Sequence, residues 1–279
     1  MSMKKVAVTG SEGFIGHAVV KELQKREIIP VILDKSLGHD VCDPTTMLKG
    51  LKSCDGVIHL AGILGTEELF DNPHKAVDIN IKGALNVILA CREYGTHYVG
   101  IQMPNTGWNN IYQSTKFCSY QLANAYRIHQ GVKTSFVRAF NAYGCYQKVY
   151  GVQKIVPTFA TKAWRGDALP IWGDGSQMVD LIHVDDIAKM LVDALQFSNG
   201  EVFDAGTGVG STVFEIAERI REITKSESSL AFYPMRKGEI SDGIPPIAQG
   251  EGWDLLNWKP VFDEEKFIET VNYYREERP

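Results

Sequence analysis

The stretch VAVTGSEGFIGHAVV, residues 6–20, decides the fold that this sequence predicts. A β-branched run leads into Gly10, Gly13 and Gly16, and an apolar pattern with helical spacing follows. Gly10 permits a tight turn, Gly13 lets the backbone approach a pyrophosphate, and Gly16 lets helix and strand pack closely. The helix N-terminus then faces the phosphate charge. The stretch therefore predicts a strand–turn–helix unit that binds a dinucleotide.

A carboxylate follows the second predicted strand, because VILD ends at Asp34. A carboxylate at this position can accept hydrogen bonds from the adenosine ribose hydroxyls and would repel a 2′-phosphate. It therefore favours NAD over NADP, although Lys35 directly after it weakens that preference. The alternative is that the glycines only shape a turn and that Asp34 is solvated.

Outward from this unit, strand-like runs alternate with helical segments. The runs are apolar on both faces, which is typical of parallel strands covered by helices on both sides. One helical segment, near 73–94, starts close to Pro73 and ends at Gly95, and another, near 111–130, ends at Gly131. The alternation predicts an α/β protein with a Rossmann-type doubly wound parallel sheet. The strand-like runs are KVAVTG, VILD, GVIHLAG, YVGIQM and TSFVRAF.

The later part of the chain predicts a smaller C-terminal α/β domain that binds substrate. We expect residues 1–150 to form the cofactor domain and residues 151–279 to form mainly the substrate domain. A strand–helix pattern near 177–206 is expected to return to the first domain. Further helices are expected near 212–225 and 263–277.

Composition excludes several classes of protein. The chain has 279 residues, of which 44% are hydrophobic and 23% charged, the balance of a folded soluble protein. Its net charge of −5 argues against a nucleic-acid partner. No secretion signal and no membrane-length apolar run are visible, and the five cysteines are spread singly. We therefore expect a cytoplasmic protein with reduced thiols, no membrane contact and no metal site.

The pair Tyr112 and Lys116 stands four residues apart and shares one face of a predicted helix. The pKa of a free tyrosine is about 10, which is too high for a base at neutral pH. A nearby ammonium group and a positive nicotinamide ring would both favour the phenolate. The pair therefore indicates a catalytic base and its partner. The alternative is two surface residues that begin an amphipathic helix.

The sequence TGSEGFIG resembles the TGxxGFIG fingerprint of the extended short-chain dehydrogenases/reductases, specifically the NAD-dependent sugar epimerase/dehydratase group. The resemblance covers nearly the whole chain. The further segments that carry it, in chain order, are HDVCD, HLAG, VDINIKGALNVILAC, YQSTK, VRAFNAYG, VPTFATKAWRGDALPIWGDGSQ, HVDDIAKMLVDAL, EVFDAGTG and MRKGE.

This resemblance implies NAD as the cofactor. It places Asp40 and Val41 near the adenine. It also implies that Asn80, from its helix, supports the segment that lines the cofactor. The cofactor residues that it implies are Gly10, Gly13, Phe14, Ile15, Gly16, Asp34, Lys35, Asp40, Val41, Leu60, Ala61, Gly62, Asn80, Tyr112 and Lys116.

The resemblance also implies that Tyr112 takes a proton from a sugar hydroxyl while Lys116 binds the nicotinamide ribose. A serine or threonine of the family is missing, because Met103 stands in its place. Thr106 is our candidate for the catalytic hydroxyl, and Gln102 or a water molecule remain alternatives. The acids used by the family's dehydratases and decarboxylases are absent from MPNTGW, which favours oxidation followed by re-reduction.

The substrate site implied by the resemblance consists of five residues. Asn141 would bond a diphosphate or sugar oxygen, and Arg236 would hold the diphosphate, with Glu239 near the distal ribose. The alternatives are a turn residue just past a strand for Asn141 and an exposed structural salt bridge for Arg236. Ile155 and Trp172 would line the pocket for the nucleotide base, although core packing explains both equally well.

A second departure from the family lies at Val179. In the resembled family an arginine commonly stands at this position and contacts the diphosphate. Its loss should weaken the binding of a nucleotide sugar or change how the substrate sits.

The function that we expect is an NAD-dependent nucleotide-sugar epimerase that acts at C4 through a transient 4-keto sugar. The alternatives are a nucleotide-sugar dehydratase, a 4-keto sugar reductase, or a non-catalytic NAD-binding regulatory protein. The resemblance also implies a homodimer formed through the helices near 73–94 and 111–130. Leu122, Ala125 and Tyr126 are candidates for that interface, and core packing is the alternative.

Overall fold

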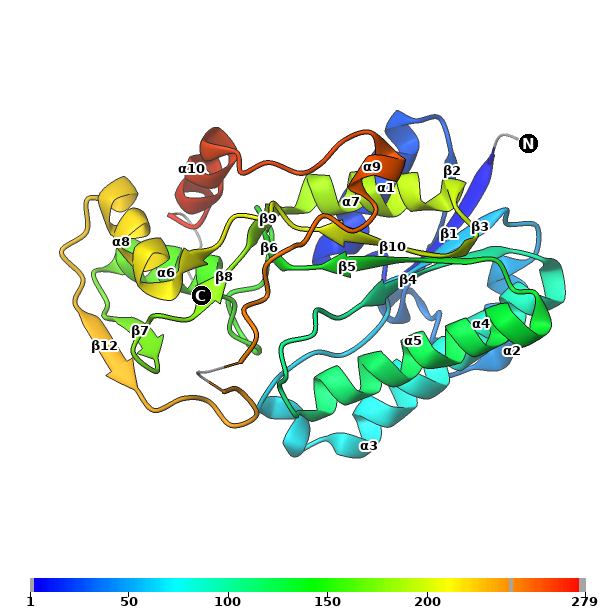
Figure 1. Ribbon diagram of the computed structural model, residues 1–279, viewed down its shortest axis with the longest axis horizontal. Helices are drawn as coiled ribbons and strands as arrows, with labels where there is room; N and C mark the ends of the chain where they lie inside the picture. The colour runs from blue at the N-terminus through cyan, green and yellow to red at the C-terminus, as the bar shows by residue number, and fades with distance from the viewer. Residues whose placement is uncertain (1–2, 241–242, 276–279) are drawn as a thin grey trace.

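A six-stranded parallel sheet forms the centre of the protein, as seen in a computed structural model that describes residues 3–240 and 243–275 (Figure 1). The strand order is β10-β5-β4-β3-β1-β2, and every neighbouring pair is parallel. The order reverses between β1 and β3, which is the kind of switch point where α/β proteins bind ligands. The predicted doubly wound fold is confirmed. The strands are β1 Lys5–Thr9, β2 Ile29–Leu33, β3 Gly56–His59, β4 His97–Gln102, β5 Thr134–Ala139 and β10 Asn199–Ala205.

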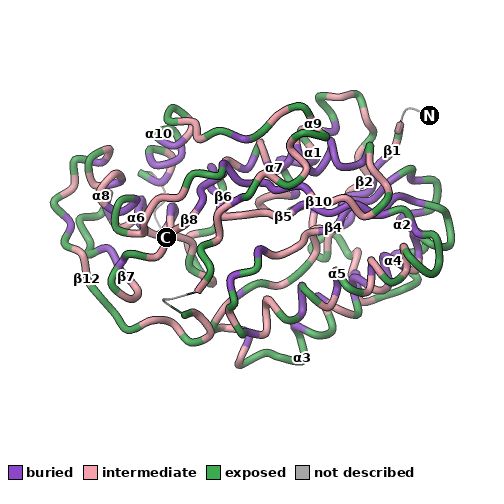
Figure 2. Tube along the Cα trace, viewed as in Figure 1, coloured by how far each residue is buried: buried purple, intermediate pink, exposed green. Residues whose placement is uncertain are grey.

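Helices cover both faces of this sheet. Along β1, Val6 and Val8 pack into the apolar cluster under α1 and α7, whereas Ala7 packs into the cluster under α2, α4 and α5. This alternation explains why the strands are apolar on both faces. Figure 2 shows the buried residues along the strands and the exposed residues on the outer sides of the helices. The helices of the two layers are α1 Phe14–Lys25, α2 Pro44–Leu51, α4 Ala84–Tyr94, α5 Ile111–Gln130 and α7 Val184–Asp193.

The helical segment predicted near 73–94 is not one regular helix. It consists of α3 Pro73–Ala76, a π-helical stretch Val77–Gly83 (η3) and α4. The backbone of Gly95 is left-handed, with φ 68°, and ends α4 as expected. A π-helical turn within a helix is frequent at functional sites, and this one contains Asn80.

A smaller α/β unit with its own apolar cluster lies beyond the carboxyl edge of the sheet (Figure 1). In it, β7 pairs with β12 in parallel, and the last described helix ends at Tyr273, so residues 276–277 of the predicted helix lie outside the described residues. Its elements are β6 Asn141–Tyr143, α6 Ile155–Arg165, β7 Leu169–Trp172, β8 Met178–Val179, β9 Leu181–His183, β11 Ser211–Thr212, α8 Val213–Thr224, β12 Leu230–Tyr233 and α10 Glu264–Tyr273.

Short elements complete the described chain, and among its helices none is long and apolar enough to cross a membrane. The same residues contain no group of three His, Cys, Asp or Glu side chains placed to hold a metal ion. The short elements are η1 Lys35–Leu37, η2 Glu68–Phe70, η4 Ala194–Gln196 and α9 Trp253–Leu256.

The chain returns to the large sheet after visiting the smaller unit, because β10 pairs with β5. Asp180 stabilises this return, since its fully buried carboxylate accepts hydrogen bonds from the backbone of Thr207, Gly208 and Ala248. The N-cap residue of α7 is His183, whose ring nitrogen accepts a hydrogen bond from the backbone nitrogen of Asp185.

Candidate functional site

The glycine-rich turn between β1 and α1 is packed tightly on one side and open on the other. A Cβ atom on Gly10, which has φ +71°, would lie 2.8 Å from the backbone nitrogen of Ala61. One on Gly16 would lie 2.1 Å from the carbonyl oxygen of Gly10. A Cβ on Gly13 would meet only that same oxygen, at 3.1 Å. The fold itself therefore requires Gly10 and Gly16, whereas Gly13 leaves room for a ligand.

We expect Gly13→Ala to weaken NAD binding by about tenfold or more, because the added methyl group keeps the pyrophosphate from the backbone amides. The fold should persist, since the methyl needs only a small shift of the Gly10 carbonyl. Titration of NAD against the purified variant measures the loss. Gly166→Ala is the control, because Gly166 has φ +74° and no neighbour within 4 Å. It should lose stability, about 1–2 kcal/mol, but not NAD affinity. Equal affinities in both variants would contradict the assignment of Gly13.

Phe14 and Ile15 open helix α1 directly after this turn, and both pack against the cluster under α1 and α7. They anchor the helix whose N-terminus points at the open side of the turn. Their predicted contact with the cofactor stays a prediction.

Asp34 lies between the ends of β1 and β2. Its carboxylate accepts hydrogen bonds from the backbone nitrogens of Glu12, at 3.1 Å, and Ser36, at 2.9 Å. Partial burial opposes its charge, but these bonds from Ser36 and Glu12 lower the pKa of Asp34 below its usual value. The neighbouring ammonium of Lys35 lies 2.8 Å from a carboxylate oxygen of Asp40. Asp34 is thus an ionised acceptor beside the glycine turn, as recognition of a ribose requires.

The remaining residues of the predicted cofactor path lie after β3 and beside α4. Val41 lies in the segment between β2 and α2 and is buried. Its carbonyl accepts a hydrogen bond from Asn86, which fixes this segment to α4. The nitrogen of Ala61 donates to the Thr9 hydroxyl at 3.2 Å. Leu60 is partly buried and Gly62 is exposed on the same loop.

Asn80 ties three segments together at this edge. Its side chain makes two hydrogen bonds with the backbone of Ile63, both of 2.9 Å, and donates to the Thr115 hydroxyl at 3.0 Å. The Thr115 hydroxyl in turn donates to the carbonyl of Tyr112. The π-helical turn therefore connects the loop after β3 to the first turn of α5, which carries the predicted catalytic pair.

Tyr112 and Lys116 lie one turn apart at the start of α5, whose N-cap is Asn110. Burial raises the pKa of Tyr112 to about 12 and lowers the pKa of Lys116 to about 8. We expected a nearby ammonium and the nicotinamide ring together to favour the phenolate, and burial acts against this expectation. Desolvation is the larger effect here, and it favours the neutral form of both groups.

His59, at the end of β3, borders Lys116. Burial, and secondarily the charge of Lys116, lowers its pKa to about 3, so the imidazole is neutral. Its Nδ1 lies 2.8 Å from the Thr9 hydroxyl. The same hydroxyl accepts a hydrogen bond from the backbone nitrogen of Ala61. The pair fixes the ends of β1 and β3 on either side of the switch point.

The loop between β4 and α5 holds Met103 where the resembled family has a hydroxyl. The Thr106 hydroxyl donates to Gln113 at 3.0 Å and accepts from the backbone of Trp108 at 3.3 Å. It shapes the loop, and a catalytic role for Thr106 stays a prediction that requires the bond to Gln113 to break. The amide oxygen of Gln102 accepts a hydrogen bond from Arg138.

On the substrate side, Arg236 and Glu239 form an ion pair with each other. The segment that carries them crosses from the smaller unit to the start of α5 (Figure 1). There the carbonyl of Gly238 accepts a hydrogen bond from Asn110 at 3.0 Å, and the nitrogen of Ile244 donates to Thr106. The segment thus places both charged residues near the predicted catalytic pair.

The other three predicted substrate residues lie on three different elements of the smaller unit. Asn141 begins β6, and its backbone nitrogen donates to Asp180. Ile155 begins α6 and packs partly against the apolar cluster of the smaller unit. Trp172 ends β7, and its ring lies 5.1 Å from that of Tyr233. Trp172 and Tyr233 are both partly exposed, so they can present flat surfaces to a base.

Comparison with known proteins identifies the family. The model of the NAD dependent epimerase/dehydratase family matches residues 6–206, more than half of the chain. This chain belongs to that family. Its cofactor is accordingly NAD, and the turn at Gly13 and the carboxylate of Asp34 fit a dinucleotide without a 2′-phosphate.

Relatives of this chain are named for several reactions. It is 25% identical to the UDP-N-acetyl-alpha-D-glucosaminuronate decarboxylase of Bacillus cytotoxicus, over 98% of both chains. It is 25% identical to the UDP-glucose 4-epimerase of Lacticaseibacillus casei, over 98% of this chain and 97% of that one. The crystal structure of UDP-glucose 4-epimerase from Thermotoga maritima with UDP-glucose has a TM-score of 0.90 and 25% identity, over 98% and 99% of the chains.

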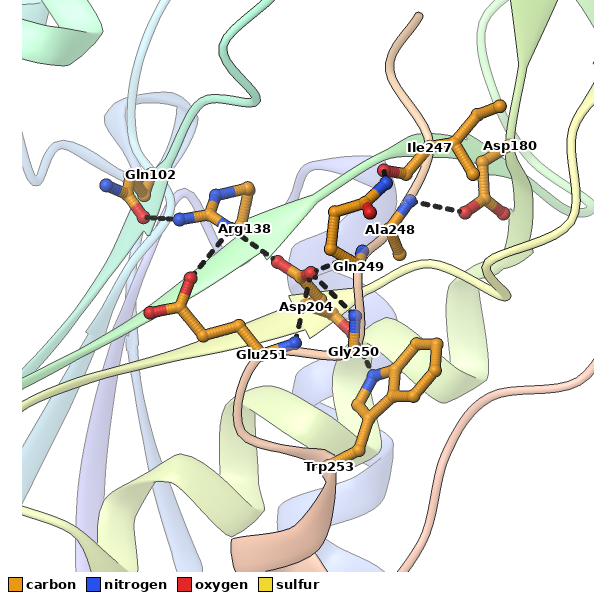
Figure 3. A network of polar contacts seen from close by, with 10 residues as sticks. All are labelled: Gln102, Arg138, Asp180, Asp204, Ile247, Ala248, Gln249, Gly250, Glu251 and Trp253. Atoms are coloured by element: carbon orange, nitrogen blue, oxygen red, sulfur yellow. Dashed lines mark hydrogen bonds and ion pairs between the residues drawn. The ribbon is translucent and has the colours of Figure 1, made fainter.

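The protein also contains a polar network that sequence reasoning missed. Gln102, Arg138 and Asp204 occupy neighbouring register positions on β4, β5 and β10. Arg138 donates to Gln102 at 3.1 Å and to Asp204 at 2.7 Å, and it also pairs with Glu251 (Figure 3). Asp204 in turn accepts hydrogen bonds from the backbone of residues 249–251. The network fixes the strand end that precedes Met103.

Among the other residues that the sequence analysis missed, one had a recognisable signal in the local sequence. Asn110, directly before a helical pattern, is a typical N-cap residue. Thr9 and His59 carried none, since only the pairing of β1 with β3 brings them together.

Proposed function

We propose that this protein is a nucleotide-sugar 4-epimerase, an isomerase within its family. The observation that supports this most is the Tyr112–Lys116 pair in the first turns of α5, where the Thr115 hydroxyl connects the carbonyl of Tyr112 to Asn80. Relatives and structural neighbours named as UDP-sugar epimerases support a nucleotide diphosphate sugar as substrate. We further propose that the protein is cytoplasmic, consistent with its five free cysteines.

In this proposal Tyr112 accepts the proton of the sugar C4 hydroxyl. It later returns the proton to the same oxygen, after the 4-keto sugar has turned and taken hydride back on the other face of C4. Lys116, next to it, stabilises the phenolate and holds the nicotinamide ribose. Bound NAD supplies the hydride acceptor and then the hydride donor, so the net redox change is zero. The positive nicotinamide ring would offset the desolvation that raises the pKa of Tyr112.

The loop at residues 103–110 favours epimerisation over the other reactions of the family. It contains no aspartate or glutamate, and its polar side chains are asparagines and Thr106. Elimination of water requires a proton donor and an acceptor at neighbouring carbons. The loop offers no carboxylate for these roles beside the sugar.

The proposal is tested by incubating the protein and NAD with UDP-glucose, UDP-N-acetylglucosamine and UDP-glucuronate, followed by NMR of the sugars. We expect inversion at C4 for one of them, without accumulation of NADH. Release of CO₂ or formation of a 6-deoxy-4-keto sugar would assign a decarboxylase or a dehydratase instead. No change with any of the three sugars, together with NAD binding, would favour a regulatory protein.

We also propose a homodimer through α4 and α5. The outer face of α5 exposes Phe117, Ala125 and Ile128, which lie on one stripe of the helix. Leu122 and Tyr126, our other candidates, are half-buried against the cluster under α4. Light scattering should give twice the chain mass of 31.1 kDa, and Phe117→Glu with Ile128→Glu should give the single mass. A wild-type monomer at micromolar concentration would contradict the proposal.

A further inference from the structure

The side-chain amide of Gln102, the last residue of β4, is held from one side. Its oxygen accepts a hydrogen bond from Arg138 at 3.1 Å, whereas its nitrogen makes no hydrogen bond with any of residues 3–240 and 243–275. Because a guanidinium group can only donate, the amide oxygen faces Arg138 and the two N–H groups point away from it (Figure 3). Gln102 thus ends its strand with two unused donors.

Arg138 fixes this orientation, because its own guanidinium is held by two carboxylates. It donates to Asp204 at 2.7 Å and pairs with Glu251 at 2.9 Å. Asp204 is fully buried, so salt and water screen this ion pair little. A half-turn of the Gln102 amide would place its N–H groups against the guanidinium, donor against donor. The network therefore selects one orientation of the amide.

Gln102 lies on the face of the sheet that α5 covers. Side chains alternate along a strand, so Tyr98, Gly100 and Gln102 share one face. Tyr98 packs into the apolar cluster under α2, α4 and α5. Gly100 pairs in register with Phe136, and the ring of Phe136 lies 4.7 Å from that of Tyr120 on α5. The row formed by Gly100 and Phe136 therefore lies beneath Tyr120.

The proposed catalytic pair lies closer to the carboxyl edge of the sheet than Tyr120 does. Helix α5 connects the parallel strands β4 and β5, so it runs antiparallel to both. Lys116 and Tyr112 precede Tyr120 by one and two turns, which moves them about 5 and 11 Å toward that edge. Gln102 lies beyond Gly100 on the same face, about 7 Å in the same direction. Its unused N–H groups therefore lie at the level of Tyr112 and Lys116.

Two neighbouring side chains do not offer such a donor. Met103, the next residue, ends in a thioether, which is a weak acceptor. The Thr106 hydroxyl has one proton and donates it to Gln113 at 3.0 Å. Gln102 is thus the residue at the end of β4 whose N–H groups are available to a ligand beside the pair.

We propose that Gln102 is a further catalytic residue, whose amide nitrogen donates a hydrogen bond to the C4 oxygen of the sugar. The inference rests on the proposed function, because it requires a sugar that is oxidised at C4. In that step the hydroxyl proton passes to Tyr112, hydride passes from C4 to bound NAD, and the C4–O bond becomes a carbonyl. When hydride returns to C4, negative charge builds up on the same oxygen until Tyr112 gives the proton back. A donor that is already in place stabilises this charge.

The test measures kcat and KM with the sugar nucleotide that the wild type inverts at C4. Gln102→Glu keeps an acceptor for Arg138 but has no amide N–H, and Gln102→Leu has neither. In both variants kcat should fall about 10²–10³-fold, the usual effect of losing one such donor. KM and the dissociation constant for UDP, measured by calorimetry, should stay within about twofold, because the contact matters most as charge develops. A purely structural role would instead weaken UDP binding together with the rate.

Two further variants serve as comparisons. Gln130→Leu is the control, because Gln130 is an exposed amide at the far end of α5, and it should keep the wild-type rate. Thr106→Val removes the competing hydroxyl and should lose less activity than Gln102→Leu. The reverse order of these two losses would overturn the inference.

The outcomes distinguish this inference from the function on which it rests. If the wild type inverts none of the sugars, the proposed function and the inference both fail. If the wild type inverts one of them and Gln102→Glu keeps the wild-type kcat, only the inference about Gln102 fails. If Gln102→Leu does not fold, Gln102→Glu decides, because it retains the bond to Arg138.

Discussion

The Tyr112→Phe variant is expected to lose about 10²–10⁴-fold in kcat, because it lacks the oxygen that accepts and returns the substrate proton. Its KM should change little, since the charged groups that hold the nucleotide lie elsewhere. The fold should persist, because the ring remains and the backbone carbonyl of Tyr112 keeps its hydrogen bond with Thr115. The rate of C4 inversion, followed by NMR at saturating substrate, measures the effect.

Tyr120→Phe is the control for this variant. Tyr120 lies two turns further along α5, half-buried with its ring 4.7 Å from that of Phe136, and its hydroxyl makes no hydrogen bond with a described residue. Loss of the Tyr120 hydroxyl should leave kcat within about twofold of the wild-type value. If Tyr112→Phe kept the wild-type rate, the proton would have to pass through another group.

The Tyr112→Phe variant also tests how bound NAD changes the pKa of Tyr112. Without NAD, the pKa values of about 12 for Tyr112 and about 8 for Lys116 mean that the lysine loses its proton first as pH rises. The positive nicotinamide ring should lower the pKa of Tyr112, because it stabilises the phenolate. The difference in tyrosinate absorbance between wild type and Tyr112→Phe reports this group, and it should move to lower pH when NAD is added.

The residues that could be predicted from the sequence are those whose roles depend on a few neighbours in the chain. The glycine turn, Asp34 after its strand and the spacing of Tyr112 and Lys116 are local patterns. Each fixes backbone geometry within one strand–helix unit, so the fold followed from them. The charge state of Tyr112 did not follow, because burial is a property of the whole packed structure.

Other features depend on residues far apart in the chain. Arg138 and Asp204 pair only because β5 and β10 are neighbours, although β10 comes from beyond the smaller unit. Thr9 and His59 likewise come together only because β1 pairs with β3. No spacing rule connects such positions.

Asp204→Ala is expected to lower the free energy of unfolding by about 3–5 kcal/mol, because it removes the buried partner of a partly buried guanidinium and the acceptor of three backbone N–H groups. Asp204 is fully buried, and one of its oxygens accepts from Arg138 at 2.7 Å. The other accepts from the backbone nitrogens of Gln249, Gly250 and Glu251 at 2.9, 3.1 and 3.3 Å. Denaturant unfolding measures the loss.

Glu251→Ala is the matched control, because its carboxylate also pairs with Arg138, at 2.9 Å, but is 52% exposed. An exposed pair contributes only about 0–1 kcal/mol. The two variants remove an acid from the same arginine, so their difference isolates burial and the three backbone bonds. Hydrogen exchange at residues 249–251 should rise in Asp204→Ala alone. If both variants lost the same stability, Asp204 would not be what holds this loop to β10, and the end of β4 at Gln102 would be positioned by other contacts.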